Sequence, residues 1–292
     1  MRPPIGSIGI VDTMIGFVRR DLRARNQWVL SQTRDRQSRE EFEAPVEYMF
    51  RDIPEKHPLE GDAVEHTLRE MDRWGIAIGM ISVAKGDDAD VAIRRHPDRF
   101  VGSFAPDPNE GVEAVRKLKR AHAELGVRAA TFFPAGFSPQ VPIDHRLMYP
   151  LYSTCVELGI PVFVNVGIPG PRVRSDCQHV ARVEEVLYDF PDLVFVMRHG
   201  AEPWVDHAVK LMVKWPNLHY STSAFAPRYY PKAVLDYANS RGAARLIYGG
   251  YFPMGLALER IMTELEDVPL RDEVWPKFLA GNAARVLGLK AE

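Results

Sequence analysis

The stretch GIVDTMIGF, residues 9–17, introduces the pattern on which the fold is built. Its first part is a short apolar run in which Ile10 and Val11 lead directly to Asp12. Runs that are apolar at nearly every position are typical of strands covered on both faces, as in a parallel sheet. We therefore expect a buried parallel strand here, followed by polar residues at the edge of the sheet where sites form in such folds.

Seven further runs of this kind follow, and most of them are separated by amphipathic stretches of helical period. The predicted strands cover residues 8–12, 76–83, 100–105, 127–133, 161–167, 193–199, 218–223 and 245–250. The predicted helices include residues 111–126, 144–159, 179–189, 203–214, 231–241 and 255–266. This alternation predicts an α/β fold, a (β/α)8 TIM barrel. No linker, repeat or low-complexity tract divides the chain, so residues 1–292 are expected to form one domain.

Two of these helices carry boundary signals of their own. In the first, apolar residues beginning with Val112 recur on one face, and Gly126 is expected to end the helix. In the second, Asp144 is expected to be the N-cap and Gly159 the end, although Pro150 disturbs the first turns.

A long insertion, residues 17–60, separates the first two predicted strands. It is rich in Arg, Asp and Glu, and it carries aromatic residues within EFEAPVEYMF at 41–50. An insertion after a barrel strand lies on the face of the barrel where active sites are found. Three interpretations stay open for it: a lid over the site, a contact between subunits of a homo-oligomer, and a solvated helical excursion.

Composition narrows the class of protein. Hydrophobic residues make up 46% of the 292-residue chain and charged residues 26%, a balance typical of globular proteins with a large core. The formal net charge of −2 gives no indication of a nucleic-acid or anionic-membrane partner, and no apolar run is long enough to span a bilayer. With two cysteines and no signal-peptide pattern, the sequence predicts a cytoplasmic protein.

Six stretches, taken in order, relate the chain to a known family. They are GIVDTMIGF (9–17), HPDRFVGSFAPDPNEGVEAVRKLKRAHAELGVRAATFFP (96–134), YPLYSTCVELGIPVFVNVGIPG (149–170), LVFVMRHGAEPW (193–204), RLIYGGYFP (245–253) and FLAGNAARVLGL (278–289). Over nearly its whole length the chain resembles the amidohydrolase-related family that includes aminocarboxymuconate semialdehyde decarboxylase and related aromatic-acid decarboxylases and hydrolases. The resemblance implies a TIM barrel and a small-molecule substrate.

The resemblance also implies where relatives bind a metal, and this chain departs from the family there. The His-x-His after the first strand falls on Met14 and Gly16, the histidine after the fifth strand on Asn165, and the aspartate after the eighth on Tyr251. Only the histidine after the sixth strand, His199, is kept. A thioether is poorly suited to zinc or manganese and glycine has no side chain. Counting ligands therefore predicts a divergent member with no metal and no other cofactor.

The same positions supply the candidate catalytic residues. His199 is predicted to be a general base, and Asn165 with Tyr251 to stabilise an oxyanion in place of a metal. The alternatives are a structural histidine that anchors the turn before Gly200 and polar residues without a role in catalysis.

Four further residues are candidates for substrate binding: Asp12, Ser223, Glu202 and Arg228. Arg228 could bind a carboxylate as a bidentate fork, although a loop arginine is more often solvated. Arg198, next to His199, is expected to point away from the site if its strand is regular.

The preferred functional hypothesis is a metal-independent hydrolase acting on a small carboxylated or aromatic ester, lactone or amide. One alternative is a metal-free carboxy-lyase, and another is a non-catalytic ligand-binding barrel derived from an enzyme. The sequence does not identify the substrate, because on this scaffold the loops determine which substrate is bound and which reaction is catalysed.

Overall fold

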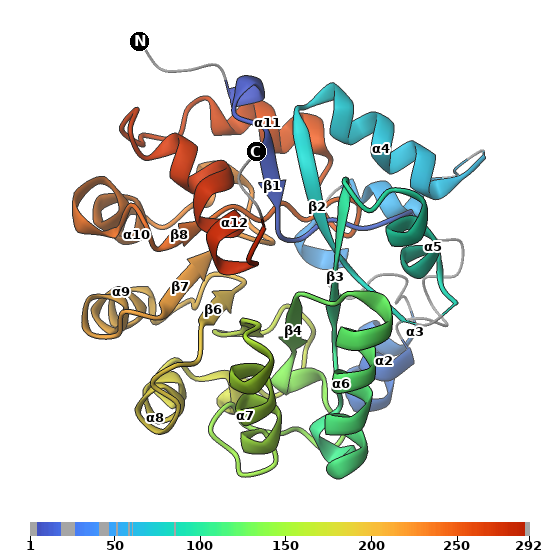
Figure 1. Ribbon diagram of the computed structural model, residues 1–292, viewed down its shortest axis with the longest axis vertical. Coiled ribbons are helices and arrows are strands. Elements are labelled where there is room, and N and C mark those ends of the chain that lie inside the picture. Colours follow the sequence, from blue (N-terminus) through green and yellow to red (C-terminus); the bar gives the residue numbers. More distant parts are fainter. Residues whose placement is uncertain are drawn as a thin grey trace.

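Eight parallel strands form one sheet in which neighbours along the chain are neighbours in the sheet. The strands are β1 (Ile10–Asp12), β2 (Ile76–Ser82), β3 (Phe100–Phe104), β4 (Ala129–Phe132), β5 (Val162–Asn165), β6 (Phe195–Arg198), β7 (Leu218–Ser221) and β8 (Leu246–Ile247). Figure 1 shows the helices arranged around these strands, so the chain is a TIM barrel, as the sequence predicts. The computed structural model describes residues 5–18, 27–40, 47–50, 52–57, 59, 61–84 and 86–289.

The described residues form eleven α-helices, and the six between residues 112 and 265 lie where the amphipathic pattern places them, with some shifted ends. They are α2 (Gln27–Gln32), α3 (Arg36–Glu40), α4 (Ala63–Arg73), α5 (Asp88–Arg95), α6 (Val112–Leu125), α7 (Tyr149–Leu158), α8 (Arg182–Asp189), α9 (Val205–Lys214), α10 (Lys232–Tyr237), α11 (Leu258–Leu265) and α12 (Asn282–Val286). Gly126 and Gly159 end α6 and α7 in the left-handed conformation, which confirms both predicted stops.

Two details of the helix predictions are wrong. Val112 is exposed, because the buried face of α6 is formed by Ala114, Leu118 and Ala121. Asp144 is not the N-cap of α7, which begins at Tyr149 with a proline in its first turn.

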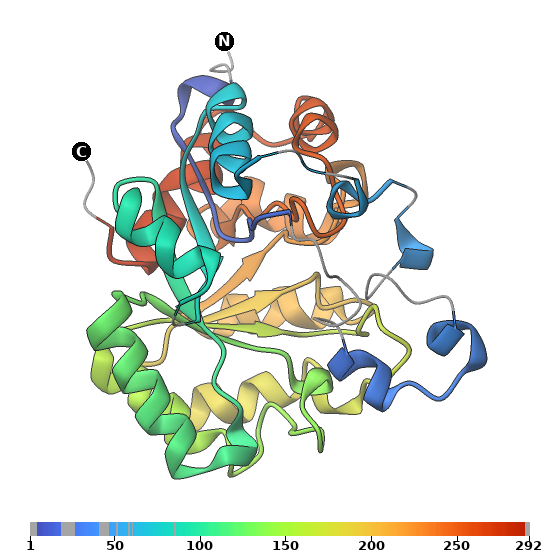
Figure 2. The same ribbon diagram turned by 90° about the vertical axis from the view of Figure 1, so that its right-hand side faces the viewer.

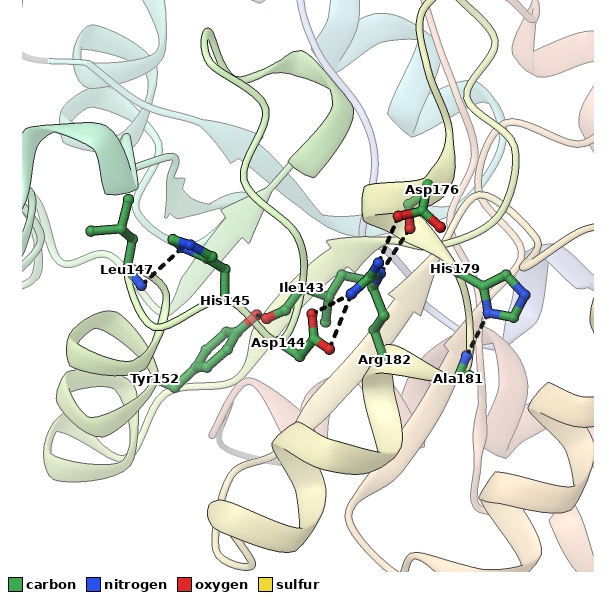
Figure 3. A network of polar contacts seen from close by, with 9 residues as sticks. All are labelled: Ile143, Asp144, His145, Leu147, Tyr152, Asp176, His179, Ala181 and Arg182. Carbon is green, nitrogen blue, oxygen red and sulfur yellow. Dashed lines mark hydrogen bonds and ion pairs between the residues drawn. The ribbon is translucent and has the colours of Figure 1, made fainter.

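Asp144 instead takes part in an ion-pair cluster that joins the loops after β4 and β5 (Figure 3). Arg182 on α8 donates to Asp144 at 2.9 Å and to Asp176 at 2.6 Å. His145 and His179 accept backbone N–H groups through their Nδ1 atoms in the same region. These contacts hold two of the loops that surround the mouth of the barrel.

The interior of the barrel is an apolar cluster with one residue from nearly every strand. Its strand members are Val11, Met80, Val101, Ala129, Phe163, Val196 and Ile247, and Ala283, Val286 and Leu287 at the C-terminal end of the chain complete it. A second, larger cluster fills the space between strands and helices. Because the strands are buried on both faces, their sequences are continuously apolar, as expected.

The seam between β1 and β8 is closed by side-chain and backbone hydrogen bonds together. Asp12 Oδ1 accepts the backbone N–H groups of Met14 and Gly250, each at 2.8 Å. Thr13 Oγ1 donates to the carbonyl of Tyr248 at 2.7 Å. In the described residues, backbone hydrogen bonds from Thr13 N–H to the Tyr248 carbonyl at 3.3 Å and from Gly16 N–H to the Phe252 carbonyl at 2.9 Å also cross this seam, together with a parallel bridge between Ile15 and Phe252. These bonds bring the end of β1 beside the end of β8.

The described part of the insertion lies over the mouth. Figure 2 shows α2 and α3 (blue) beside the loops that follow β4 and β5. Gln32 donates to the carbonyl of Gly136 at 2.8 Å, and Arg172 pairs with Asp35 at 2.8 Å. We call residues 27–40, 47–50 and 52–57 the covering segment. Residues 19–26 and 41–46, with part of the predicted aromatic stretch, lie outside the described residues.

Among the described helices, none combines the length and the hydropathy needed to cross a membrane. Cys155 and Cys177 are both buried and unpaired with each other.

The seam gives a prediction about pH. Burial raises the pKa of Asp12 to about 6 from an ordinary value of 3.8. As pH rises from 3.8 to about 6, the Asp12 carboxyl ionises first in the unfolded chain and only later in the folded protein. Ionisation of Asp12 therefore lowers the free energy of unfolding by up to about 3 kcal/mol. Asp12→Asn removes this titration, so its free energy of unfolding should rise relative to the parent between pH 4 and 7.

Urea unfolding of both proteins at several pH values measures this difference. Other titrating groups, such as the buried His219, cancel between parent and variant. A difference that does not change with pH would contradict the assignment.

Candidate functional site

A polar layer lies above the apolar interior at the C-terminal ends of the strands. On most strands, the residue two positions after the interior residue is small and polar, charged, or glycine. Side chains two positions apart point to the same face of a strand, so these residues also face inward. They are Thr13, Ser82, Ser103, Thr131, Asn165, Arg198 and Gly249. The polar layer is therefore the floor of the barrel mouth.

A cavity of about 270 Å³ opens above this floor, and we call it the aromatic chamber. Its aromatic lining residues are Phe50, Phe132, Phe133, Phe225 and Tyr251. Its polar lining residues are Thr131, Asn165, Gln178, Arg198 and His199. Met49 and Phe50 belong to the covering segment, so this segment forms part of the chamber wall.

Arg198 is the principal charged group of the chamber. The residue is 8% exposed, and within the described residues no carboxylate lies within ion-pair distance of it. Its Nη2 lies 2.7 Å from Met14 Sδ, a weak acceptor, and its Nε has no hydrogen-bond partner in the described part of the chain. Burial lowers the pKa of the guanidinium to about 10, which still leaves it charged at neutral pH. A buried cation of this kind is prepared to bind an anion.

His199 follows β6 in a strained backbone conformation. Its φ is 61° and that of Ala201 is 55°, both in the left-handed region that non-glycine residues rarely adopt. His199 Nδ1 lies 3.1 Å from Ser223 Oγ and 3.4 Å from the Ser223 carbonyl oxygen. Burial, with a smaller contribution from the charge of Arg198, lowers the pKa of His199 to about 3. The imidazole is therefore neutral at pH 7.

Asn165 and Tyr251 complete the polar wall. Asn165 is 8% exposed, and its Oδ1 is buried without a hydrogen-bond partner among the described residues. Burial raises the pKa of Tyr251 to about 12, so its hydroxyl keeps its proton. The Tyr251 ring makes an edge contact with His199, with centroids 5.7 Å apart, and a tilted contact with Phe50, with centroids 5.6 Å apart. The three predicted catalytic residues thus line one chamber.

The four predicted substrate-binding residues are not among the residues that line the aromatic chamber. Asp12 is fully buried at the seam, and Ser223 is fully buried against His199. Glu202 is exposed, and its backbone carbonyl accepts the N–H of Ile168. Arg228 is exposed and pairs with Glu264 at 3.4 Å.

The expectation that Arg198 points away from the site is wrong. Arg198 shares its face of β6 with Val196, an interior residue, whereas His199 lies beyond the strand in a turn. The sequence around it, FVMRH, is apolar before the arginine and so contains no signal of which face is inward. A useful signal would have been the polar residue that recurs two positions beyond the interior residue on neighbouring strands.

The residues at the family's metal positions do not fit a metal ion. In the described part of the chain, no three histidine, cysteine, aspartate or glutamate side chains come together in a metal-binding group. Met14, at the first ligand position, contacts the guanidinium of Arg198 instead. A fixed cation at this point repels a divalent ion and supplies no lone pair.

The geometry defines a class: a TIM barrel with a cation-centred, aromatic-walled site at the C-terminal ends of its strands. The amidohydrolase family model matches residues 11–289, so the chain belongs to the amidohydrolase family. A comparison with curated protein sequences gave no significant match.

Solved structures share the fold at low sequence identity. An uncharacterised TIM-barrel protein from Bordetella bronchiseptica is 23% identical with a TM-score of 0.70, covering 96% of this chain and 98% of that one. A 2,6-dihydroxybenzoate decarboxylase from Rhizobium is 15% identical with a TM-score of 0.68, covering 97% and 99%. A dihydroxybenzoic acid decarboxylase from Polaromonas, with bound manganese, is 15% identical with a TM-score of 0.66, covering 97% and 98%.

The isolated charge of Arg198 gives a prediction about stability. Replacing a buried charge that lacks a partner by an apolar side chain of similar length removes a desolvation cost, so Arg198→Met should raise the free energy of unfolding by about 1–3 kcal/mol. The same variant should lose affinity for benzoate. Urea unfolding and calorimetric titration measure the two effects. A destabilised variant would indicate that Arg198 has a structural partner.

Proposed function

We propose that this protein is a metal-independent hydrolase that acts on a small aromatic ester, lactone or amide carrying a carboxylate. The observation that carries the proposal is the buried guanidinium of Arg198, which faces an aromatic chamber with no carboxylate partner among the described residues. Membership of the amidohydrolase family supports an enzymatic role at this end of the barrel.

Arg198 would bind the carboxylate of the substrate, the role that the sequence suggested for Arg228. A guanidinium offers paired N–H donors that match a carboxylate, and the pairing is strongest where water is excluded. The aromatic residues of the chamber would hold the apolar body of the substrate, and Phe50 of the covering segment would help to exclude water.

His199 would accept the proton of the attacking water. If Nδ1–H is donated to the Ser223 carbonyl, Nε2 is the free acceptor. A substrate carboxylate on Arg198 offsets the positive charge that helps to weaken this base, so binding strengthens it. The Tyr251 hydroxyl and the amide N–H of Asn165 would donate to the oxygen of the scissile carbonyl as negative charge develops there.

A carboxy-lyase reaction is the second candidate, because several structures with the same fold are decarboxylases. A cation that stabilises the substrate carboxylate opposes its loss as neutral CO2, since the charge moves away from the cation as the bond breaks. Hydrolysis therefore suits Arg198 better. A non-catalytic ligand-binding barrel would bind the same carboxylates without turnover.

The activity prediction uses two matched esters, 3-acetoxybenzoate and acetoxybenzene. The parent protein should hydrolyse the carboxylated ester with a kcat/KM about 100-fold higher, because only this ester pairs with Arg198. Arg198→Met should abolish the difference, and His199→Asn should lower the rate for both esters about 100-fold. Arg228→Met should have little effect.

The results separate the three hypotheses. CO2 release from dihydroxybenzoates without ester hydrolysis would favour the lyase. Binding of benzoate without turnover of either class would favour the non-catalytic barrel. Loss of activity in Arg228→Met but not in Arg198→Met would overturn the assignment of the carboxylate site.

The pH dependence of kcat/KM tests the role of His199. Because its pKa in the free protein is about 3, the residue stays unprotonated above pH 5, and activity should not fall as pH decreases from 8 to 5. Initial rates across this range, at constant ionic strength, measure the profile. An acid limb near pH 6.5 that disappears in His199→Asn would contradict the environment described for this residue.

A further inference from the structure

A second cavity, of about 230 Å³, adjoins the aromatic chamber on the other side of Arg198. Hydroxyl groups from the ends of several strands enter its lining: Thr13, Ser82, Ser103 and Thr131. We call it the hydroxyl chamber. Met14, Thr131 and Arg198 line both cavities, so these three residues form the wall between them.

We propose that the two chambers form one bipartite site for a 2-substituted carboxylate. In this site, the aromatic chamber holds the apolar body and the hydroxyl chamber holds a hydrogen-bond-donating arm attached beside the carboxylate. This inference rests on the proposed function only for the position of the carboxylate at Arg198. Met14 is the specificity-determining residue, because it limits the size of the arm.

The position of Arg198 makes the arm short. A carboxylate held at the wall between the chambers leaves the carbon next to it close to both cavities. One substituent on that carbon can then extend into the aromatic chamber while another enters the hydroxyl chamber.

The hydroxyl chamber favours a donor over an acceptor. Ser103 Oγ donates to the carbonyl of Ile81 at 3.2 Å, and Thr13 Oγ1 donates to the carbonyl of Tyr248 at 2.7 Å. A hydroxyl whose proton is already donated retains lone pairs and acts as an acceptor toward a ligand. The buried Glu55 lies in the same lining. An arm that carries an O–H or N–H group matches these acceptors.

Met14 is well placed to act as a partition. Its thioether is flexible, it contacts Arg198 through Sδ, and it lies in the wall that both chambers share. Shortening this side chain opens the wall without removing the guanidinium.

Calorimetric titration with two matched acids tests the arm without requiring turnover. Phenylacetate and mandelate differ only by a hydroxyl on the carbon next to the carboxylate. We expect the parent protein to bind mandelate about fivefold more tightly, as one added hydrogen bond predicts. Ser103→Ala should remove this preference and leave phenylacetate binding unchanged. Ser153→Ala, an exposed serine on α7, is the matched control and should change neither affinity.

A larger arm tests the partition. N-acetylphenylglycine should bind the parent more weakly than mandelate does, and Met14→Ala should improve its binding about tenfold while changing phenylacetate by less than about threefold.

The failures are distinguishable. Equal binding of phenylacetate and mandelate would overturn the bipartite site and leave the carboxylate position at Arg198 intact. Binding of neither acid at about 20 mM would overturn the carboxylate position itself, and with it the bipartite site.

Discussion

The site depends on the seam at which the end of β1 meets the end of β8. One carboxylate oxygen of Asp12 accepts two backbone N–H groups there, from Met14 and Gly250. The seam fixes where the segment after β1 runs, and therefore places Met14 against the guanidinium of Arg198. It also brings Tyr251, which follows β8, into the same chamber. A polar contact that closes the barrel thus also assembles the wall of its cavity.

Burial of Arg198 explains much of the electrostatics around it. Its charge and the low polarity of the chamber act together to keep His199 neutral, and burial keeps Tyr251 protonated. The backbone strain at His199 and Ala201 lies in the turn directly after β6. Strain of this kind costs stability and tends to be found at functional sites, where the surrounding structure holds it in place. At the position where the family resemblance places the first metal ligand, this chain has Met14, which contacts the guanidinium of Arg198.

For the covering segment, the sequence predicts where the segment lies, and only the structure shows which of its residues reach the site. Its position after the first strand predicted that it would lie at the barrel mouth, and its contacts with Gly136 and with Arg172 confirm this. Its contribution of Phe50 to the chamber wall could not be predicted, because nothing local in the sequence specifies which residue of a long insertion folds back onto the site.

By itself the sequence determined the number, order and approximate place of the strands, the stops of α6 and α7, and the absence of the family's histidines at Met14 and Gly16. These features depend on local periodicity, on glycine conformation and on residue identity, all of which are readable along the chain. Only the tertiary structure decided that Arg198 faces inward. A strand buried on both faces has apolar residues at successive positions, so its sequence does not show which of them face the barrel interior. The direction of each side chain is set by the sheet into which the strand is built.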